Sequence, residues 1–506
     1  MKNQPLIRLA GVGIALLLAV GCTLGPDPER PATAADVSDG FVHASGADAK
    51  PLPEVTPWWQ EFGDETTTVL VELALANNPD LRAAAARVLE AEAGLRRAGG
   101  AMWPQVGYGA GGTRQKMSFV LPGTGRREIF STTYSYDLNV SWQADFFGRL
   151  KRTRQASWAS LLAEEASREA VIHSVVGAVV RARVLVATAG WALDINRDIT
   201  ESWQSTLSTV ERRYRAGIAD AVEVHLAREN LASARASEAV IAAQLEQAKL
   251  ALDVLVGRRP GSGGDLPDTL PRLPSLDPVP VGLPAQLLDR RPDLRQAEMQ
   301  LAAATYGVGA AIATLYPDLS LTGSAGGRSD TLADLTSVDG IVYNAIASLV
   351  GPIFSGGQRR ADVDAARARA EQATALYAGA VLNALRDVEE ALVLSEASQR
   401  NREFSDQRVE EARAADRLAK ERYQRGVGGL LTVLETERRL RLAEQANLAA
   451  TADVWSSRID LFLSLGGDWS TDTPSAEVGD SEERGKQAES TIPNSEFLIP
   501  NSREVL

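Results

Sequence analysis

Residues 213–218 read Arg-Tyr-Arg-Ala-Gly-Ile, and residues 422–427, about 209 positions later, read Arg-Tyr-Gln-Arg-Gly-Val. Each copy opens a run of roughly 40 residues. The first run closes on Leu-Val-Gly at 255–257 and the second on Ser-Leu-Gly at 464–466. The recurrence of one motif with the same sequel indicates a duplicated unit.

Landmarks that precede each copy keep the same order. Asn-Pro-Asp-Leu-Arg at 78–82 matches Arg-Pro-Asp-Leu-Arg at 291–295, and an aromatic-Pro step follows each of them. We therefore expect repeat 1 over residues 67–257 and repeat 2 over residues 285–467. A doubled unit of this length predicts two halves that do the same job around one axis.

The composition favours long packed helices. Aromatic residues make up 6% of the 506 residues, and alanine alternates with Arg, Glu and Gln over long stretches. The net charge of −13 argues against a nucleic-acid partner, since no strongly basic face offsets it.

The N-terminus predicts a lipoprotein signal peptide over residues 1–21. Two basic residues precede an apolar run at 9–20, which is too short to span a membrane. Cys22, the only cysteine, comes straight after this run and resembles the lipobox cysteine that receives a diacylglycerol. The alternative is a buried free thiol. Thr23, where inner-membrane lipoproteins commonly have Asp, favours the outer membrane.

Alternation of apolar and polar residues predicts a β-hairpin at about 104–146. Residues 133–143 alternate over about ten positions, and residues 105–113 alternate similarly. The segment between them, with Pro122-Gly123, is expected to be the hairpin loop. Repeat 2 offers a matching hairpin at about 317–354, with strands expected at 318–325 and 341–354, although the last alternates less cleanly.

Helical patterns surround both hairpins. One runs over 67–101 with a break near Pro79, and two uninterrupted ones cover 149–215 and 358–425. At 1.5 Å per residue, each of the last two would be about 100 Å long. Return helices of roughly 35 residues and the helices before the hairpins would each cover about half of that length.

Three segments fall outside the repeats. Residues 22–66 are expected to be extended, with Trp58-Trp59 as packing anchors, and residues 258–284 form a Pro/Gly-rich linker. Residues 468–506 are polar and acidic, and we expect them to be a disordered tail.

Strands with one apolar and one polar face, in an exported chain, suggest a transmembrane β-barrel. Four strands cannot close a barrel, and open edges in lipid leave backbone groups unpaired. A dimer would pool eight strands, too few for a pore, whereas a trimer would pool twelve. A soluble sandwich is the alternative, but four strands joined to such long helices could hardly enclose one.

At this point the chain resembles the TolC-type outer-membrane factors, specifically their NodT-like lipoprotein branch. The resemblance covers residues 22–467. Its most specific pieces are Gly21-Cys22-Thr23-Leu24-Gly25-Pro26 through Arg30-Pro31, Trp58-Trp59 with Phe62-Gly63-Asp64, Arg291-Pro292-Asp293-Leu294, and the two Arg-Tyr-x-x-Gly turns.

The resemblance implies a mainly α fold with a transmembrane β part. The implied assembly is a homotrimer with a 12-stranded β-barrel continuous with a 12-helix periplasmic α-barrel, and residues 22–66 and 258–284 would lie at an equatorial belt. The implied function is the exit duct of a tripartite efflux pump, lipid-anchored in the outer membrane with most of the chain in the periplasm. Its partners would be outer-membrane lipid, a periplasmic adaptor and an inner-membrane transporter of the RND type. The export duct of a type I secretion system is an alternative.

The resemblance also implies an iris at the periplasmic end. The family's aperture acids fall on Thr432, a departure, and on Glu435, where three side chains would form a ring that favours cations. Glu223 falls where relatives tie the closed state to the tyrosine of the second turn, here Tyr423. Gly428 stands where the family has a further Arg. The alternative for Glu435 is a solvated helix residue.

The two turns resemble the tips that contact the adaptor. The expected contact residues are Gly217, Ile218, Gly426, Val427 and Gly428. Plain turns without a partner are the alternative, because flexible glycine suits both roles.

An enzyme is not expected. The three histidines, His43, His173 and His225, lie far apart, and no nucleophile elbow, phosphate loop or Cys-His cluster appears. We therefore expect no catalytic residue, no metal and no cofactor, and no nucleic-acid partner. A periplasmic coiled-coil scaffold anchored only by lipid is the remaining alternative, but it leaves the alternating strands unexplained.

Overall fold

The computed structural model describes residues 23–31, 40–44, 57–121, 125–267, 269–276, 279, 281, 284–335 and 341–467. These residues belong to one compact unit that ends at Gly467. The expected signal peptide, Cys22 and the expected tail at 468–506 lie outside the described residues.

The elements follow in the order η1 (Trp58–Phe62), α2 (Glu65–Asn77), α3 (Pro79–Gly100), β1 (Gln105–Leu121), β2 (Gly125–Ala144), α4 (Arg149–Arg215), α5 (Ala221–Leu255), α6 (Pro284–Arg290), α7 (Pro292–Ala313), β3 (Asp318–Ser329), β4 (Ile341–Val350), α8 (Gln358–Gln424) and α9 (Leu430–Ser464).

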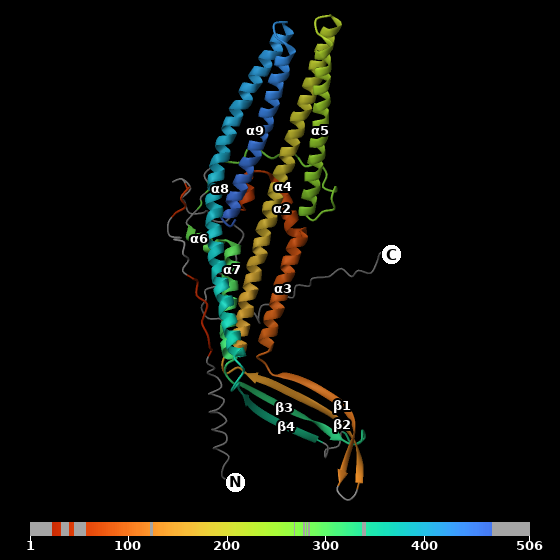
Figure 1. Ribbon diagram of the computed structural model, residues 1–506, viewed down its shortest axis with the longest axis vertical. Helices are drawn as coiled ribbons and strands as arrows, with labels where there is room; N and C mark the ends of the chain where they lie inside the picture. The colour runs from red at the N-terminus through yellow and green to blue at the C-terminus, as the bar shows by residue number, and fades with distance from the viewer. Residues whose placement is uncertain are drawn as a thin grey trace. The chain divides into compact units, whose positions relative to one another are not determined.

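The two halves repeat the same helix lengths in the same order. A 22-residue helix precedes each hairpin, a 67-residue helix follows it, and a 35-residue helix returns. The short helices α3 and α5 both pack on α4, and α7 and α9 both pack on α8 (Figure 1). Helices α7 and α9 also contact α4, so α4 joins the two halves.

The helix expected at 67–101 is two helices that meet at Asn78. Its side chain accepts hydrogen bonds from the amides of Asp80 and Leu81, and Pro79 occupies the first helical position. Proline suits that position because its missing N–H would have no helical partner there. Pro292 begins α7 in the same way.

The four strands form one antiparallel sheet in the order β1-β2-β3-β4. The first hairpin lies within the expected 104–146, but its strands are longer and its loop shorter than expected, because the pairing of β1 with β2 continues to Leu121 opposite Gly125. Strand β4 is shorter than expected and ends at Val350, because Gly351 and Pro352 follow and proline cannot donate to the ladder.

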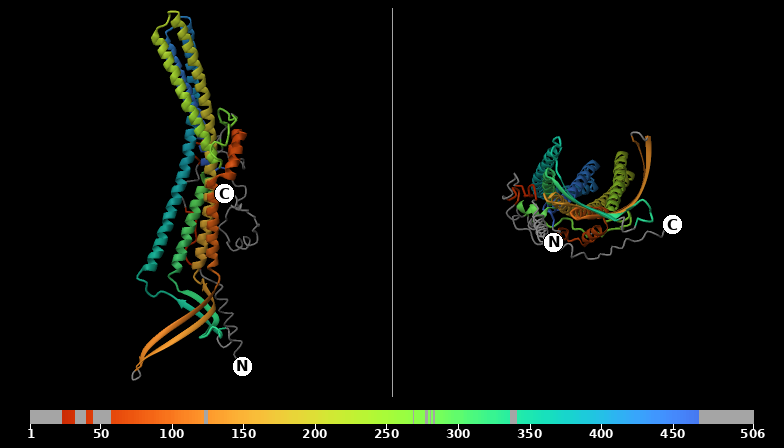
Figure 2. Two further views of the ribbon diagram at one scale, coloured as in Figure 1. Left: turned by 90° about the vertical axis from the view of Figure 1, so that its right-hand side faces the viewer. Right: turned by 90° about the horizontal axis from the view of Figure 1, so that it is seen from below.

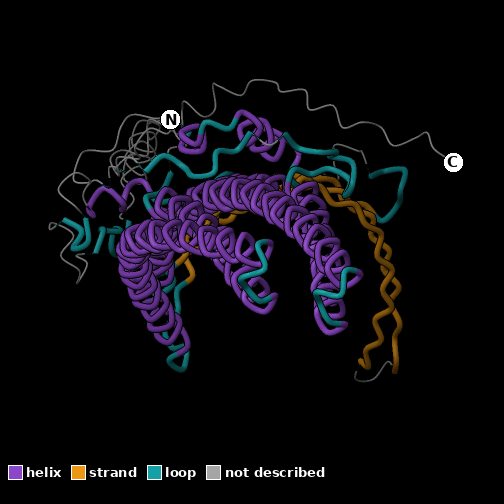
Figure 3. Tube along the Cα trace, turned by 90° about the horizontal axis from the view of Figure 1, so that it is seen from above, coloured by secondary structure: helices purple, strands orange, loops and turns teal. Residues whose placement is uncertain are grey.

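Apolar side chains of the sheet are exposed in the single chain, among them Val106, Tyr108, Leu138 and Tyr343. Strands β1 and β4 are both edges, and the sheet stays open (Figure 2). Seen along their length, the helices form a curved row rather than a closed bundle (Figure 3). The apolar face and the free edges therefore require further surface to cover them.

Aromatic side chains hold η1 against α9. Trp58 stacks on Phe462 with ring centroids 5.6 Å apart, and Phe62 meets Trp455 at 4.9 Å. Trp58-Trp59 are buried packing anchors, as the sequence predicts. Nearby along the chain, Asp64 at the start of α2 forms a buried ion pair with Arg183 of α4 at 3.0 Å.

Helix α4 is the one described helix with a window long and apolar enough to cross a membrane by length and composition. More than half of that window is buried inside the protein, where α4 packs against its neighbouring helices. Packing against these helices therefore accounts for its apolarity.

Candidate gate at the helical tips

The two copies of the Arg-Tyr-x-x-Gly motif close α4 and α8 with the same geometry. Gly217 and Gly426 adopt left-handed φ angles of 70° and 78°. The amide of Ile218 donates to the carbonyl of Arg213 at 2.9 Å, and the amide of Val427 donates to that of Arg422 at 3.0 Å. Such caps satisfy the last helical carbonyls, and glycine takes the left-handed angle without the strain of a Cβ.

The outer ends of both turns carry exposed apolar side chains. Ile218 is 67% exposed and Val427 is 64% exposed. An added Cβ at Gly217 or Gly426 would meet open space, whereas one at Gly428 would come within 3.2 Å of Arg422. The five predicted tip residues thus lie on the two turns, two on the first and three on the second. The apolar side chains of Ile218 and Val427 are exposed there.

Tyr423 connects the second turn to α5, the helix that follows the first turn. Its hydroxyl donates to Glu223 Oε2 at 3.1 Å. Burial together with the charge and hydrogen bond of Glu223 raises the pKa of Tyr423 to about 12. The structure therefore brings together the two side chains that the sequence analysis paired.

Arg213 is a third member of this contact that the sequence analysis missed. Its guanidinium lies 4.5 Å from the ring centre of Tyr423 and donates to the Tyr423 carbonyl at 3.2 Å. Arg213 lies at the end of α4, in the first copy of the motif, and reaches across to the tyrosine of the second copy. The signal was its place in the repeated motif itself, one residue before Tyr214.

Glu435 lies three residues after Thr432 near the start of α9, and both are accessible to solvent. The Glu435 carboxylate accepts hydrogen bonds from Arg438 at 3.0 Å and from Arg439 at 2.7 Å. These bonds lower its pKa to about 2. Its negative charge is therefore accompanied by two guanidinium groups of the same helix.

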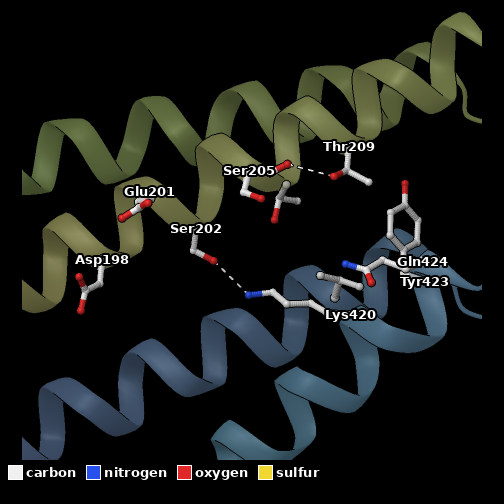
Figure 4. Close-up of a pocket in the computed structure, with 10 residues that line it drawn as sticks. Asp198, Glu201, Ser202, Ser205, Thr209, Lys420, Tyr423 and Gln424 are labelled. Carbon is white, nitrogen blue, oxygen red and sulfur yellow. Dashed lines mark hydrogen bonds between the residues drawn. The ribbon is translucent and has the colours of Figure 1, made fainter.

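A polar cavity of about 380 Å³ lies between α4 and the pair formed by α8 and α9, next to Tyr423 (Figure 4). Ser202 projects from α4 and donates to Glu437 at 2.8 Å, and Lys420 donates to Ser202 at 3.1 Å. Glu437 is fully buried. A charged residue on the buried stripe between Val433 and Leu440 was the available signal, and the sequence analysis did not use it.

The histidines do not converge. His43 lies 2.7 Å from Glu389, His173 is buried in α4, and His225 is exposed on α5. Within the part of the chain that the structure describes, no group of three or more His, Cys, Asp or Glu side chains could hold a metal ion.

Comparison with known proteins gives a consistent result. Residues 70–258 and 283–467 match the family described as outer membrane efflux protein. The pyoverdine export outer membrane protein OpmQ of Pseudomonas putida is 32% identical over 447 residues, covering 86% of this chain and 93% of OpmQ. The solvent efflux pump outer membrane protein SrpC of Pseudomonas putida is 32% identical over 460 residues, covering 90% of this chain and 97% of SrpC. The solved outer-membrane channel OprN has a TM-score of 0.80 at 30% identity, covering 88% of this chain and 99% of OprN.

Proposed function

The chain belongs to the outer membrane efflux protein family, and from this we propose that it is the outer-membrane exit duct of a tripartite efflux pump. The observation that carries the proposal is an open four-stranded sheet joined to two 67-residue helices. The same arrangement matches the channel OprN over nearly its whole length. Neither a lipid-anchored scaffold nor a soluble sandwich accounts for an exposed apolar sheet.

Three copies would complete the duct. Pooled strands give a 12-stranded barrel, which is wide enough for a pore and leaves no edge in lipid. The curved row of helices in one chain supplies one third of an α-barrel that continues from this β-barrel. Solved relatives of this chain are outer-membrane channels, which supports the same assembly.

The tips would form the gate. The Tyr423–Glu223 hydrogen bond joins the pair α4–α5 to the pair α8–α9. A hydrogen bond to a charged group stabilises by about 1.5–3 kcal/mol, which is weak enough for contacts with a partner to replace it. Thr432 and Glu435 would line the aperture of the closed trimer. The exposed Ile218 and Val427 would meet a periplasmic adaptor, which connects the duct to an inner-membrane transporter of the RND type.

Cys22 would carry the lipid anchor, since it is the only cysteine and directly follows an apolar signal sequence. The cargo would be small molecules, and their choice would belong to the inner-membrane partner. Pyoverdine and solvents are named for the relatives OpmQ and SrpC.

The function is tested by deleting the gene and measuring accumulation of a fluorescent efflux dye in whole cells. We expect accumulation to rise and to return to the original level when the chain is restored. Unchanged accumulation of a panel of dyes, together with loss of a secreted protein, would instead favour the type I secretion alternative.

A further inference from the structure

Residues 23–31 form a strap that packs against α4 and α7 near the sheet end of the helices. Arg152, in the first turn of α4, is buried and points its guanidinium at this strap. It donates from Nε to the Leu24 carbonyl at 3.0 Å, from Nη2 to the Gly25 carbonyl at 3.1 Å, and from Nη1 to Asp27 at 2.6 Å. Nη1 also donates to Gln155 at 3.2 Å, and the ring of Tyr306 lies 5.5 Å away.

Close backbone approach on both sides gives the strap a shaped seat. Gly25 has a φ of 91°, and a Cβ there would lie 2.3 Å from the Gly309 Cα. A Cβ on Gly309 would lie 2.7 Å from the Leu24 carbonyl, and one on Gly148 would lie 3.0 Å from the Thr23 Cα. Only glycine fits at Gly25 and Gly309, because real Cβ atoms do not approach so closely, and the left-handed φ of 75° favours glycine at Gly148.

A second contact sets the direction of the strap. Arg30 pairs with Glu298 at 2.9 Å and with Asp289 at 3.0 Å. Gly309 and Glu298 are separated by about 16 Å of helix at 1.5 Å per residue. The residues from Gly25 to Arg30 span about the same length when extended. The strap therefore runs along α7, and its first residue lies toward the end of α7 that leads into β3.

We propose that Arg152 and Gly309 form a seat for Thr23–Asp27, and that this seat fixes Thr23, the residue to which the acylated Cys22 is joined, beside the junction of helices and sheet. The inference rests on the proposed acylation of Cys22. Arg152 acts as a positioning residue, because it holds the strap and not the lipid. Three of the four hydrogen bonds of this guanidinium go to the strap, so most of its partners are lost if the strap leaves the seat, and unpaired buried charge is strongly unfavourable. The anchor and the strands then meet the same membrane surface.

The seat is tested by the mobility of a nitroxide at the exposed Pro26, attached through Pro26→Cys in the full acylated chain. We expect an immobilised spectrum in the parent and in Gly307→Ala, whose added Cβ meets nothing within 4 Å. Gly309→Ala and Arg152→Ala should convert it to a mobile one. Immobilised spectra in both of these variants, or a mobile one in Gly307→Ala, would overturn the seat.

Labelling stoichiometry separates this inference from the acylation on which it depends. Cys22 is the only natural cysteine, so one label per Pro26→Cys chain, counted after labelling the denatured chain in which a buried thiol is also reached, means that the Cys22 thiol is blocked. Two labels per chain would show a free thiol and overturn acylation, and with it this use of the seat. One label on a mobile strap would overturn the seat alone.

A positioning role also predicts dependence on the anchor. In the acylated chain, Arg152→Ala should lower the yield of membrane-inserted trimer several-fold, with partial rescue by Arg152→Lys. In a chain with Ser at position 22, exported by a conventional signal peptide, Arg152→Ala should cause no further loss. An equal loss in both backgrounds would show a purely structural role and overturn the proposal.

Discussion

Tyr214 and Tyr423 occupy the same place in two copies of one turn, yet their surroundings differ. Tyr214 is 48% exposed, whereas Tyr423 is 4% exposed and donates to Glu223. Arg213 packs on the Tyr423 ring and comes from the other copy of the motif. The duplicated sequence therefore supplies both halves of an unequal contact, and we propose that this contact holds the tips closed.

Tyr423→Phe removes the hydroxyl from this contact. We expect the closed state to lose about 1.5–3 kcal/mol and single-channel conductance in planar bilayers to rise. Glu223→Ala should act similarly, and the double variant should add little, because both changes break one bond. Tyr214→Phe is the matched control. Unchanged conductance in the double variant would rule out a role of the Tyr423–Glu223 hydrogen bond in closing the channel.

The same contact predicts a dependence on alkaline pH. The pKa of Tyr423 is raised from 10 to about 12, so the folded chain holds the phenol proton more tightly than the unfolded chain does. The stabilisation is therefore complete below pH 10 and is lost as the pH rises through about 12. Tyrosinate absorbance should show the titration near pH 12 in the parent and not in Tyr423→Phe. A difference spectrum that titrates near pH 10 would contradict the buried contact.

Glu435 shows how local pairing modifies the charge that we propose for the aperture. Its carboxylate is bonded to Arg438 and Arg439, so a ring of three would attract cations less than three unpaired carboxylates. Replacing both arginines by Gln should raise the cation selectivity of the reconstituted channel, and Glu435→Gln should lower it. The reversal potential in a salt gradient measures both, with the exposed Arg425→Gln as control. Identical reversal potentials throughout would remove Glu435 from the aperture.

At the scale of elements, the tips matter because their caps leave apolar side chains outside. The turns are fixed by backbone hydrogen bonds, and Ile218 and Val427 are not needed to fill a core. Exposed apolar residues at the end of a rigid hairpin suit a partner of similar shape.

Ile218→Asp with Val427→Asp should therefore weaken the adaptor contact. We expect a loss of at least tenfold, or about 1.4 kcal/mol, in the amount of adaptor crosslinked in cells, with trimer yield unchanged. Val240→Asp is the matched control, since Val240 is 57% exposed on α5 away from the turns. Equal crosslinking in all three proteins would leave the tips as plain turns.

At the scale of the whole molecule, a sheet with two free edges demands other copies of the chain. Alkaline extraction of a chain with Ser at position 22 separates a barrel from a lipid-anchored scaffold. We expect that chain to stay in the membrane and to migrate as a heat-modifiable trimer, because the strands insert independently of the lipid. Release into the soluble fraction would favour the scaffold.

Much of the architecture was predictable because it is periodic. The long helices lie at the residues that the sequence indicated, since a 3.6-residue pattern sustained over about 67 positions is typical of one continuous helix. The strands of the first hairpin were underestimated because residues 114–121 and 125–132 lack clean alternation, and strand pairing extends through them regardless. The buried Glu437 was missed because one charge on an apolar stripe does not disturb the period.

The sequence by itself determined the repeat, the helices, the four strands, the glycine turns and the need for more than one copy. These features depend on local pattern and chain length, which are read along the chain. Only the tertiary structure decided which copy of each repeated residue is buried, that Arg213 and Glu223 reach Tyr423, and that Arg152 holds the strap. Those contacts join residues about 125–210 positions apart. Their geometry depends on how helices of equal length pack side by side, which no local pattern encodes.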